Sequence, residues 1–399
     1  MTRDEGANLL PLEGIVVLSL EQAVAAPFAT RQLADLGARV IKIERVGEGD
    51  FCRGYDASVN GLASYFVWLN RTKESLTLDV KQPAGLAVLE ALLGRADVFV
   101  ANLSSDALAR LGLDPAALRV RHAGLITCSV TGYDPNGDQR ARRAYDLLVQ
   151  AETGTVAVTG SPTEAAKVGI SIADIAAGMY AFSGVLTALF VRERTGVARA
   201  VEVNLFDALT EWMSQPLYVA AGSGASPPRR GVHHASIAPY GPVDTADGAI
   251  VIVAVQNPAE WRRFCAEVLL QPELADEARF ATNVARTAHR DDLEAIIASV
   301  ASRLTAVELT GRLEAADVPY GALRTPLEAL EALRGRLGPL PLVASEAGPI
   351  EILGQPFTLD GAPLALGRVP ALGQDTDAIL AELGHDPASI AALREAHSV

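Results

Sequence analysis

The stretch GIVVLSLEQAVAAPFATRQLADLGARVIKIE, residues 14–44, decides the fold. Residues 14–20 form a compact apolar run typical of a buried strand, and RVIKIE, residues 39–44, forms a second one. Between them, PFATRQLADLG has a proline near its start and a glycine at its end, as helices commonly do. Strand, helix and strand at this spacing predict a right-handed crossover between two parallel strands.

The same alternation continues along the first half of the chain. Residues 75–80, 97–103 and 125–133 have the character of strands, residues 84–96 that of a helix, and residues 111–124 are helical in part. The pattern predicts an α/β fold with an open, parallel, nucleotide-binding-like sheet. No G-x-G-x-x-G follows the first strand, so the sequence does not support dinucleotide binding.

The regular alternation of strands and helices stops after about residue 200. GSGASPPRRGVHH, residues 222–234, is typical of a linker or an active-site loop, and residues 238–255 are typical of a β-hairpin that turns at 246–248. Helical patterns continue to about residue 316, short strands follow residue 318, and a helix covers 375–383. We therefore expect a smaller α+β domain of residues 225–320.

Composition excludes several functions. The net charge of −14 argues against nucleic acid as a partner. Three distant cysteines suit neither a disulfide framework nor a zinc site, and adjacent His233 and His234 have no second ligand cluster, so no metal is expected. The polar start MTRDEGANLLPLEG has no apolar signal core. The longest uncharged apolar run, residues 179–191, is too short to span a membrane, so we expect a cytoplasmic protein without membrane contact.

One carboxylate has a special position. In ISIADIAAGMYAFSGVLTALFVRERTG, residues 170–196, Asp174 lies where a β-branched stretch enters a long apolar helix. The helix dipole and the free N–H groups of a helix start favour the ionised form, which a carboxylate nucleophile needs. An aspartate at this place is also a good helix N-cap, and the residues alone leave both roles open.

Four cations follow the expected strands. Arg45 comes after the second strand, Lys81 after the third, Arg110 beyond the fourth and Arg143 beyond the fifth. Ligands of an open parallel sheet bind beyond the carboxyl ends of its strands. These cations could form a phosphate site there, or each could be an ordinary surface charge.

Several stretches together resemble the class III coenzyme A transferases, the family of formyl-CoA transferase and the carnitine CoA-transferases. They are AAPFATRQLADLGARVIKIERVGEGD, WLNRTKESLTLDVK, ADVFVANL, YDLLVQAETG, the Asp174 segment and PALGQDTDAIL, which extend over nearly the whole chain. The resemblance implies that Asp174 is the nucleophile, that coenzyme A (CoA) is a substrate and no cofactor is tightly bound, and that the chain forms an interlocked homodimer. It implies too that residues 321–399 return to residues 1–224 and form one large CoA-binding domain with them. It also implies that CoA contacts Val24, Ala25, Arg45, Leu78, Lys81, Asn102, Leu103, Arg110 and Arg143.

Departures from the family's sequence patterns limit which substrates and reactions are expected. Formyl-CoA transferase has a glutamine at the place of Val24 and a run of glycines where this chain has RRGVHHASIAPYGP, which argues against oxalate or formate. Related α-methylacyl-CoA racemases, the alternative function, use the His of a G-H-D motif. This chain has Ala144, Tyr145 and Asp146 there, and tyrosine is a poor base near neutral pH.

The acyl acceptor is the remaining question. LEQAVAAPF and HHASIAPYGP most resemble members that act on four- and five-carbon dicarboxylic acids such as succinate, malate, itaconate and mesaconate. A second carboxylate needs a cation or hydrogen-bond donors to hold it. The candidates for this role are Arg53, Tyr145, His233, His234 and Tyr240. An intramolecular shift of CoA between two carboxylates of one mesaconyl group would use the same aspartate.

Overall fold

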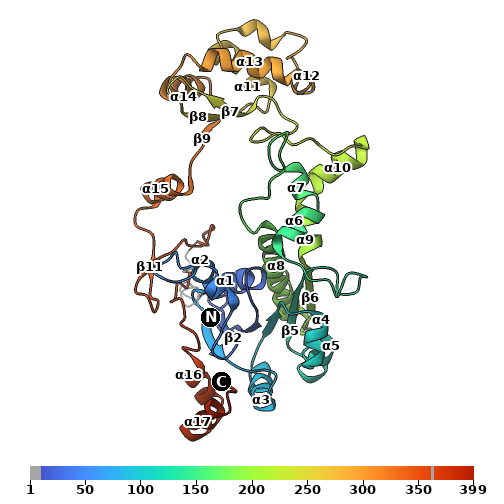
Figure 1. Cartoon of the computed structure of the whole chain (residues 1–399), viewed down its shortest axis with the longest axis vertical. Helices are drawn as coiled ribbons and strands as arrows, with labels where there is room; N and C mark the ends of the chain where they lie inside the picture. The colour runs from blue at the N-terminus through green and yellow to red at the C-terminus, as the bar shows by residue number, and fades with distance from the viewer. Residues whose placement is uncertain (1–9, 361–363) are drawn as a thin grey trace. The chain divides into compact units, whose positions relative to one another are not determined.

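The computed structural model of the chain describes residues 10–360 and 364–399 (Figure 1). The chain divides into two compact units. The first contains the residues up to Thr153, then Val168–Ser214 and Pro339–Val399, and the second contains Gly154–Lys167 and Gln215–Gly338. The second unit thus begins and ends at other residues than the sequence predicts, and it includes a short segment from the first half of the chain.

A six-stranded sheet of parallel strands forms the centre of the first unit. Its strand order is β3-β2-β1-β4-β5-β6, and each neighbouring pair is parallel, which confirms the predicted open α/β sheet. The strands are β1 Val16–Leu20, β2 Arg39–Glu44, β3 Glu74–Thr77, β4 Val98–Ala101, β5 Ile126–Thr131 and β6 Ala200–Asn204. Sequence patterns did not predict β6, because only Asn204 of this edge strand is buried and the strand lacks an apolar run.

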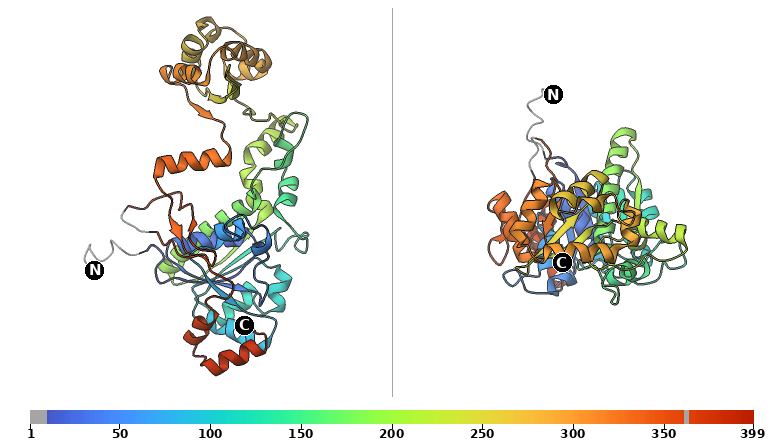
Figure 2. Two further views of the ribbon diagram at one scale, coloured as in Figure 1. Left: turned by 60° about the vertical axis from the view of Figure 1, so that its left-hand side comes forward. Right: turned by 90° about the horizontal axis from the view of Figure 1, so that it is seen from above.

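Helices cover both faces of this sheet. Side chains alternate along a strand, so Val17 and Leu18 of β1 belong to cores on opposite faces. The Val17 face is covered by α1 (Ala25–Asp35), α8 (Ile172–Thr195) and α9 (Leu205–Trp212). The Leu18 face is covered by α3 (Pro83–Leu93), α4 (Ser105–Arg110), α5 (Pro115–Arg121), α16 (Thr376–Glu382) and α17 (Pro387–Glu395). Figure 2 shows the C-terminal helices (red) on the face of the sheet away from α1 (blue).

The C-terminal segment completes the first unit by pairing with β3. The Ser75 amide donates to Asp375 Oδ2 at 2.9 Å, and the Thr77 amide donates to Thr376 Oγ1 at 3.1 Å. Ile379 and Leu380 of α16 are fully buried in the core on that face. The return of the chain end to the first unit, which the resemblance implied, is therefore present in the structure.

Helix α8 is long and apolar enough, by length and composition alone, to cross a membrane. The sequence prediction considered only its uncharged stretch and found it too short. In the fold, Ala177, Ala181 and Val185 of α8 are fully buried against the sheet and α1. A core helix meets the same criteria as a membrane span, and the packing of α8 is that of a core helix.

The second unit has its own sheet and core. Its sheet is antiparallel with the order β7-β8-β9, formed by Tyr240–Asp244, Ile250–Ala254 and Tyr320–Ala322. The first two strands are the predicted hairpin, and Gly248 at its turn has a positive φ of 78°. The helices that follow are α11 Pro258–Arg263, α12 Asn283–Ala288, α13 Arg290–Ala301, α14 Ala306–Ala315 and α15 Pro326–Leu337. Trp261, Phe264, Phe280 and Leu293 form much of the core.

The remaining elements are short. They are the 3₁₀ turn η1 Phe51–Gly54, α2 Ser64–Asn70, α6 Asp146–Glu152, α7 Thr155–Val158, α10 Ser214–Ser223, the π-helical turn η2 Phe264–Val268, the 3₁₀ turn η3 Pro272–Ala275, β10 Leu342–Val343 and β11 Ile350–Glu351.

Candidate active site

The strand order places the expected ligand crevice at the carboxyl ends of β1 and β4. These two strands are neighbours, and the order of the sheet reverses between them, which is where open α/β sheets bind ligands. Val24 and Ala25 follow β1 at the start of α1, and Asn102 follows β4. The side chains of Val24 and Ala25 are buried, so these residues can contact a ligand only through their backbone.

A glutamine that sequence reasoning missed joins three strand ends at this crevice. The Gln22 amide donates to Asn102 Oδ1 at 2.9 Å, and Asn102 Nδ2 donates to the Gln22 carbonyl at 2.7 Å. Arg45, after β2, donates to Gln22 Oε1 at 3.0 Å. Gln22 therefore brings together the ends of β1, β2 and β4, and with them two of the residues expected to contact CoA. Its position directly after the first strand was the only sequence signal.

The predicted cations are available to a ligand. Arg45 is exposed, and its pair with Glu48 at 3.4 Å is a surface contact that contributes little. Lys81, Arg110 and Arg143 are exposed and form no ion pair with any residue in the described parts of the chain. The neighbouring Arg142, by contrast, is paired with Glu152.

The remaining residues expected to contact CoA are apolar. Leu78 directly follows β3 and is buried, and Leu103 follows Asn102 and is half-buried.

Asp174 lies in the first turn of α8 but is not its N-cap. Ser171 occupies the N-cap position, with no capping hydrogen bond from its side chain. The interpretation of Asp174 as a simple helix cap is therefore wrong. Within residues 10–360 and 364–399, its half-buried carboxylate has no hydrogen bond and no ion pair, which leaves both oxygens available for chemistry.

Helix α6 supplies the cap that α8 lacks. Asp146 Oδ1 accepts from the Ala173 amide at 2.8 Å, and Gln150 Nε2 donates to Asp146 Oδ2 at 2.7 Å. Gln150 is fully buried and also accepts from the Val168 amide at 2.9 Å. The spacing of Asp146 and Gln150, one helical turn apart, was a signal for this pair that our sequence analysis did not use.

Burial changes the charge state expected for Asp174. Loss of hydration, followed by the negative charge of Asp146, raises the pKa of the Asp174 carboxyl from 3.8 to about 7. The sequence argument considered only the helix dipole and predicted a carboxylate held in its charged form. The structure corrects this, because desolvation and a like charge outweigh the dipole. A strongly shifted carboxyl without a hydrogen-bond partner among the described residues is a candidate functional group.

Aromatic side chains line the start of α8. Tyr65 Oη lies 3.2 Å from Ser171 Oγ, and the rings of Tyr55 and Tyr65 are 5.7 Å apart. Burial, with contributions from Asp50 and Asp174 among others, raises the pKa of Tyr55 to about 12, so its hydroxyl remains a donor. The predicted Tyr145 is 65% exposed just before α6, whereas the sequence analysis missed Tyr55 and Tyr65.

Arg53 is held by protein groups. It donates to Glu44 twice, each time at 2.8 Å, and its guanidinium lies 3.6 Å from the ring centre of Phe66. A third contact runs to the Pro370 carbonyl at 3.3 Å. The Glu44 side chain is fully buried, so Arg53 would leave a buried carboxylate unpaired if it turned to a substrate. The structure therefore favours a structural role for Arg53.

Three predicted residues come together in the second unit. The His234 ring stacks on Tyr240 at 5.1 Å, and the His234 amide donates to the Tyr240 carbonyl at 2.9 Å. His233 Nδ1 lies 3.1 Å from Glu294 Oε1. In the described part of the chain no group of three or more His, Cys, Asp or Glu residues has the arrangement of a metal site. The cluster therefore offers hydrogen-bond donors and acceptors for an organic ligand.

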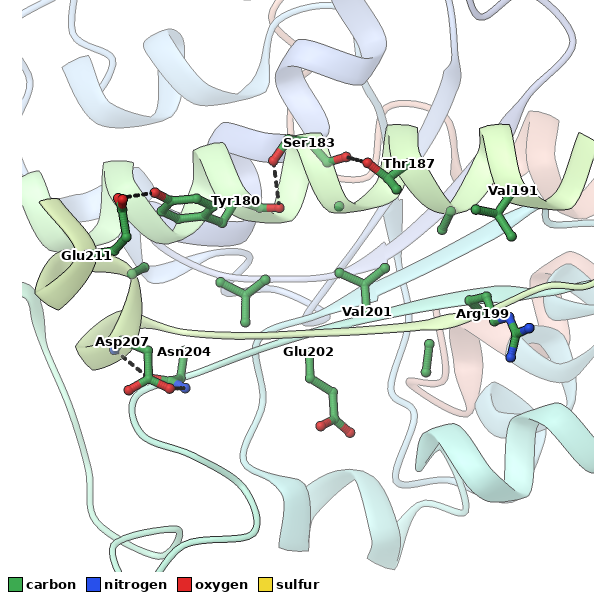
Figure 3. A pocket seen from close by; sticks show the side chains of 15 residues that line it. Tyr180, Ser183, Thr187, Val191, Arg199, Val201, Glu202, Asn204, Asp207 and Glu211 are labelled. Atoms are coloured by element: carbon green, nitrogen blue, oxygen red, sulfur yellow. Dashed lines mark hydrogen bonds between the residues drawn. The ribbon is translucent and has the colours of Figure 1, made fainter.

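A separate groove follows the sheet edge at β6. It has a volume of about 640 Å³ and lies between α8, β6 and α9, with Tyr180, Val191, Val201 and Glu211 among its lining residues (Figure 3). Tyr180 donates to Glu211 Oε2 at 2.5 Å. The groove contains none of the predicted site residues, and the sequence analysis did not foresee it.

Comparisons with known proteins agree with this fold and identify the family. The family model described as CoA-transferase family III matches residues 12–376. The succinate–glutarate CoA-transferase of Agrobacterium fabrum is 35% identical over 384 residues, which cover 94% of this chain and 96% of the relative. The succinyl-CoA:mesaconate CoA-transferase of Haloarcula marismortui is 30% identical, with 94% and 97% covered. The crystal structure of a CAIB/BAIF family protein from Brucella suis has a TM-score of 0.80 and 32% identity, covering 94% of this chain and 99% of that chain.

The chain belongs to CoA-transferase family III and is a CoA-transferase. The predicted family is thereby confirmed.

Proposed function

We propose that this enzyme moves CoA between an acyl-CoA thioester and a short-chain dicarboxylic acid of four or five carbons, with Asp174 as the nucleophile. The observation that carries the proposal is the state of Asp174: a desolvated carboxylate, without hydrogen bonds among the described residues, at the start of α8. The close approach of α8 to the CoA-side loop supports it. A Cβ on Gly178, one turn after Asp174, would lie 2.6 Å from the Ala25 carbonyl.

The transfer of CoA proceeds through four successive nucleophilic attacks. Asp174 attacks the donor thioester, the C–S bond breaks, and an aspartyl–acyl anhydride and CoA thiolate result. The thiolate attacks the aspartyl carbonyl, releasing the donor acid and leaving an Asp174–CoA thioester. The acceptor carboxylate attacks this thioester, giving a second anhydride and thiolate. The thiolate then attacks the acceptor carbonyl, and the carboxylate of Asp174 is restored. Every nucleophile is an anion, so no proton has to be transferred.

Backbone groups near the crevice can stabilise the tetrahedral oxyanions. Val24 is the N-cap residue of α1 and provides no capping side chain, so the first N–H groups of α1 have no intrahelical or capping partner. Oxyanion stabilisation by such fixed donors is commonly the largest contribution to acyl transfer. The residues that follow Asp174 are a second candidate source of such donors.

The acceptor class rests on the relatives and on the donors of this chain. Relatives are named for succinate with glutarate and for succinyl-CoA with mesaconate. Tyr145, which lies just before α6 in the same unit as Asp174, offers a hydrogen bond for the carboxylate that does not react. The same aspartate would serve an intramolecular shift between two carboxylates of one acyl group.

An acceptor screen tests this function. The purified protein is incubated with succinyl-CoA and glutarate, mesaconate, itaconate, malate, oxalate or formate, and new CoA thioesters are measured by mass spectrometry. We expect transfer to at least one five- or four-carbon dicarboxylate, and rates at least about 100-fold lower with oxalate and formate. Deuterium uptake at the α-carbon of an acyl-CoA, without CoA exchange, would instead identify the racemase alternative.

We also propose that the chain acts as a cytoplasmic homodimer. Two observations support the homodimer. Edge strand β6 borders a groove of about 640 Å³, and the apolar side chains Met179, Tyr180 and Trp212 on the bordering helices α8 and α9 are partly exposed, as is typical of a surface that binds another protein chain. Analytical ultracentrifugation at micromolar concentration should give about twice the chain mass of 41.9 kDa. A species of single-chain mass at every concentration would exclude the dimer.

A further inference from the structure

The loop between β1 and α1 contains a strained residue. Ala23 has a φ of 62°, in the left-handed region that residues with a Cβ rarely adopt. Such a conformation persists only where the surroundings fix it. Val24 and Ala25, whose backbone groups we propose to contact CoA, follow immediately, so the direction of their N–H groups depends on the conformation of Ala23.

One buried carboxylate holds this residue. Asp50 Oδ1 accepts from the Ala23 amide at 3.1 Å and from the Cys52 amide at 3.0 Å. Asp50 Oδ2 accepts from Lys42 Nζ at 2.8 Å, and the side chains of both charged residues are fully buried. Lys42 also donates to the Glu21 carbonyl at 3.4 Å, which fixes the residue that begins the same loop.

Asp50 thus connects two loops that border the proposed site. Through Ala23 it fixes the loop after β1, and through Cys52 it fixes η1 in the loop after β2. The second loop begins with Arg45 and ends beside Tyr55, whose pKa is influenced by Asp174. No other described side chain accepts a hydrogen bond from the Ala23 amide.

We propose that Asp50 is a positioning residue for CoA binding, which keeps Ala23 in the left-handed conformation and so directs the N–H groups at the start of α1 toward the ligand. The inference rests on the proposed function, because it takes the start of α1 to be part of the CoA site. Asp50 itself does not touch the substrate in this scheme.

The geometry makes Asp50→Asn informative. In one orientation, the oxygen of the new asparagine side chain still accepts from the Ala23 backbone N–H, but its NH₂ group then faces the Lys42 ammonium. In the other orientation, the oxygen accepts from Lys42, and the Ala23 N–H then faces the NH₂ group, which is also a donor. One partner is lost in either orientation. We expect the dissociation constant of CoA, measured by calorimetry, to rise about tenfold. We expect kcat to fall as well, by about tenfold, because the same N–H groups are proposed to stabilise the oxyanions.

Variants at Ala23 test the same inference without changing a charge. Ala23→Val places a β-branched side chain at a positive φ and should weaken CoA binding about as much as Asp50→Asn does. Ala23→Gly in the Asp50→Asn background should restore most of the affinity, because glycine adopts this conformation without strain. A purely structural role of Asp50 would give no such rescue.

Asp35→Asn is the matched control. Asp35 is a fully buried carboxylate that pairs with Arg31 and Arg71 at the far end of α1, so the variant makes the same charge change away from the loop. It should lower the melting temperature and leave CoA affinity within about twofold. If Asp50→Asn does not fold, the CoA affinity of Ala23→Val relative to the wild type is a sufficient test of the inference.

Two results would overturn the inference. Wild-type CoA affinity in both Asp50→Asn and Ala23→Val would exclude the positioning role and leave the proposed function intact. A wild-type protein that binds no CoA would exclude the proposed function, and the inference with it.

Discussion

Asp174→Asn should abolish CoA transfer, with kcat reduced at least about 10⁴-fold, because the amide cannot form the anhydride or the enzyme-bound thioester. The change preserves the size and shape of the side chain, and the wild-type carboxylate has no hydrogen bond among the described residues that the variant would lose. CoA affinity should therefore stay close to that of the wild type, and the melting temperature near neutral pH should be equal or higher, because the variant removes a desolvated charge. Asp174→Ala, which cannot revert by deamidation, should be equally inactive.

Chemical trapping gives a second measurement of the same claim. Wild-type enzyme incubated with acyl-CoA and hydroxylamine should carry a hydroxamate on Asp174, found by peptide mass spectrometry, and either variant should carry none. Transfer at the wild-type rate by Asp174→Ala would contradict the central proposal.

The activity should also depend steeply on pH near neutrality. The pKa of Asp174 is raised to about 7, so the reactive carboxylate predominates above that pH and is lost as the pH falls through it. Below about pH 6, kcat/KM should decline roughly tenfold per unit, because this parameter reports ionisation of the free enzyme. Between pH 8 and pH 5 the loss should reach about 100-fold.

Asp146→Asn should move this profile toward lower pH, because it removes the negative charge that helps to raise the pKa of Asp174. The midpoint should stay above 3.8, since the contribution of burial remains. Glu395→Gln, which removes an exposed carboxylate at the end of α17, is the control and should leave the midpoint unchanged. An unshifted midpoint in Asp146→Asn would show that Asp174 is not the titrating group.

The residues that sequence reasoning placed well depend on local patterns. β1, α1 and β2 follow directly from apolar runs and helix-end signals, because each is buried along its length. Strand β6 gives little signal since it lies at the sheet edge and is mostly half-exposed. The fold could thus be predicted from the elements that are buried within it.

The properties of the site depend on contacts that sequence spacing does not encode. The cap of α8 comes from Asp146, 27 residues away from the amide that it accepts from. Arg53 forms an ion pair with Glu44 because the Glu44 side chain at the end of β2 is buried. The pKa of Asp174 is raised because surrounding elements remove water from its carboxyl group. Position in the sequence predicted which residues follow the strand ends, and tertiary packing determined their charge and their partners.

The pairing of Ser75 with Asp375, 300 residues later, has a consequence for biosynthesis. At about 5–20 residues per second, roughly 15–60 s separate the emergence of these two residues from the ribosome. During that interval the Leu76 face of the nascent sheet lacks its covering from Ile379 and Leu380. The second unit is translated during this interval, so its core can form before the core of the first unit is complete. The helices that are synthesised last, α16 and α17, then cover the sheet whose first strands were synthesised earliest.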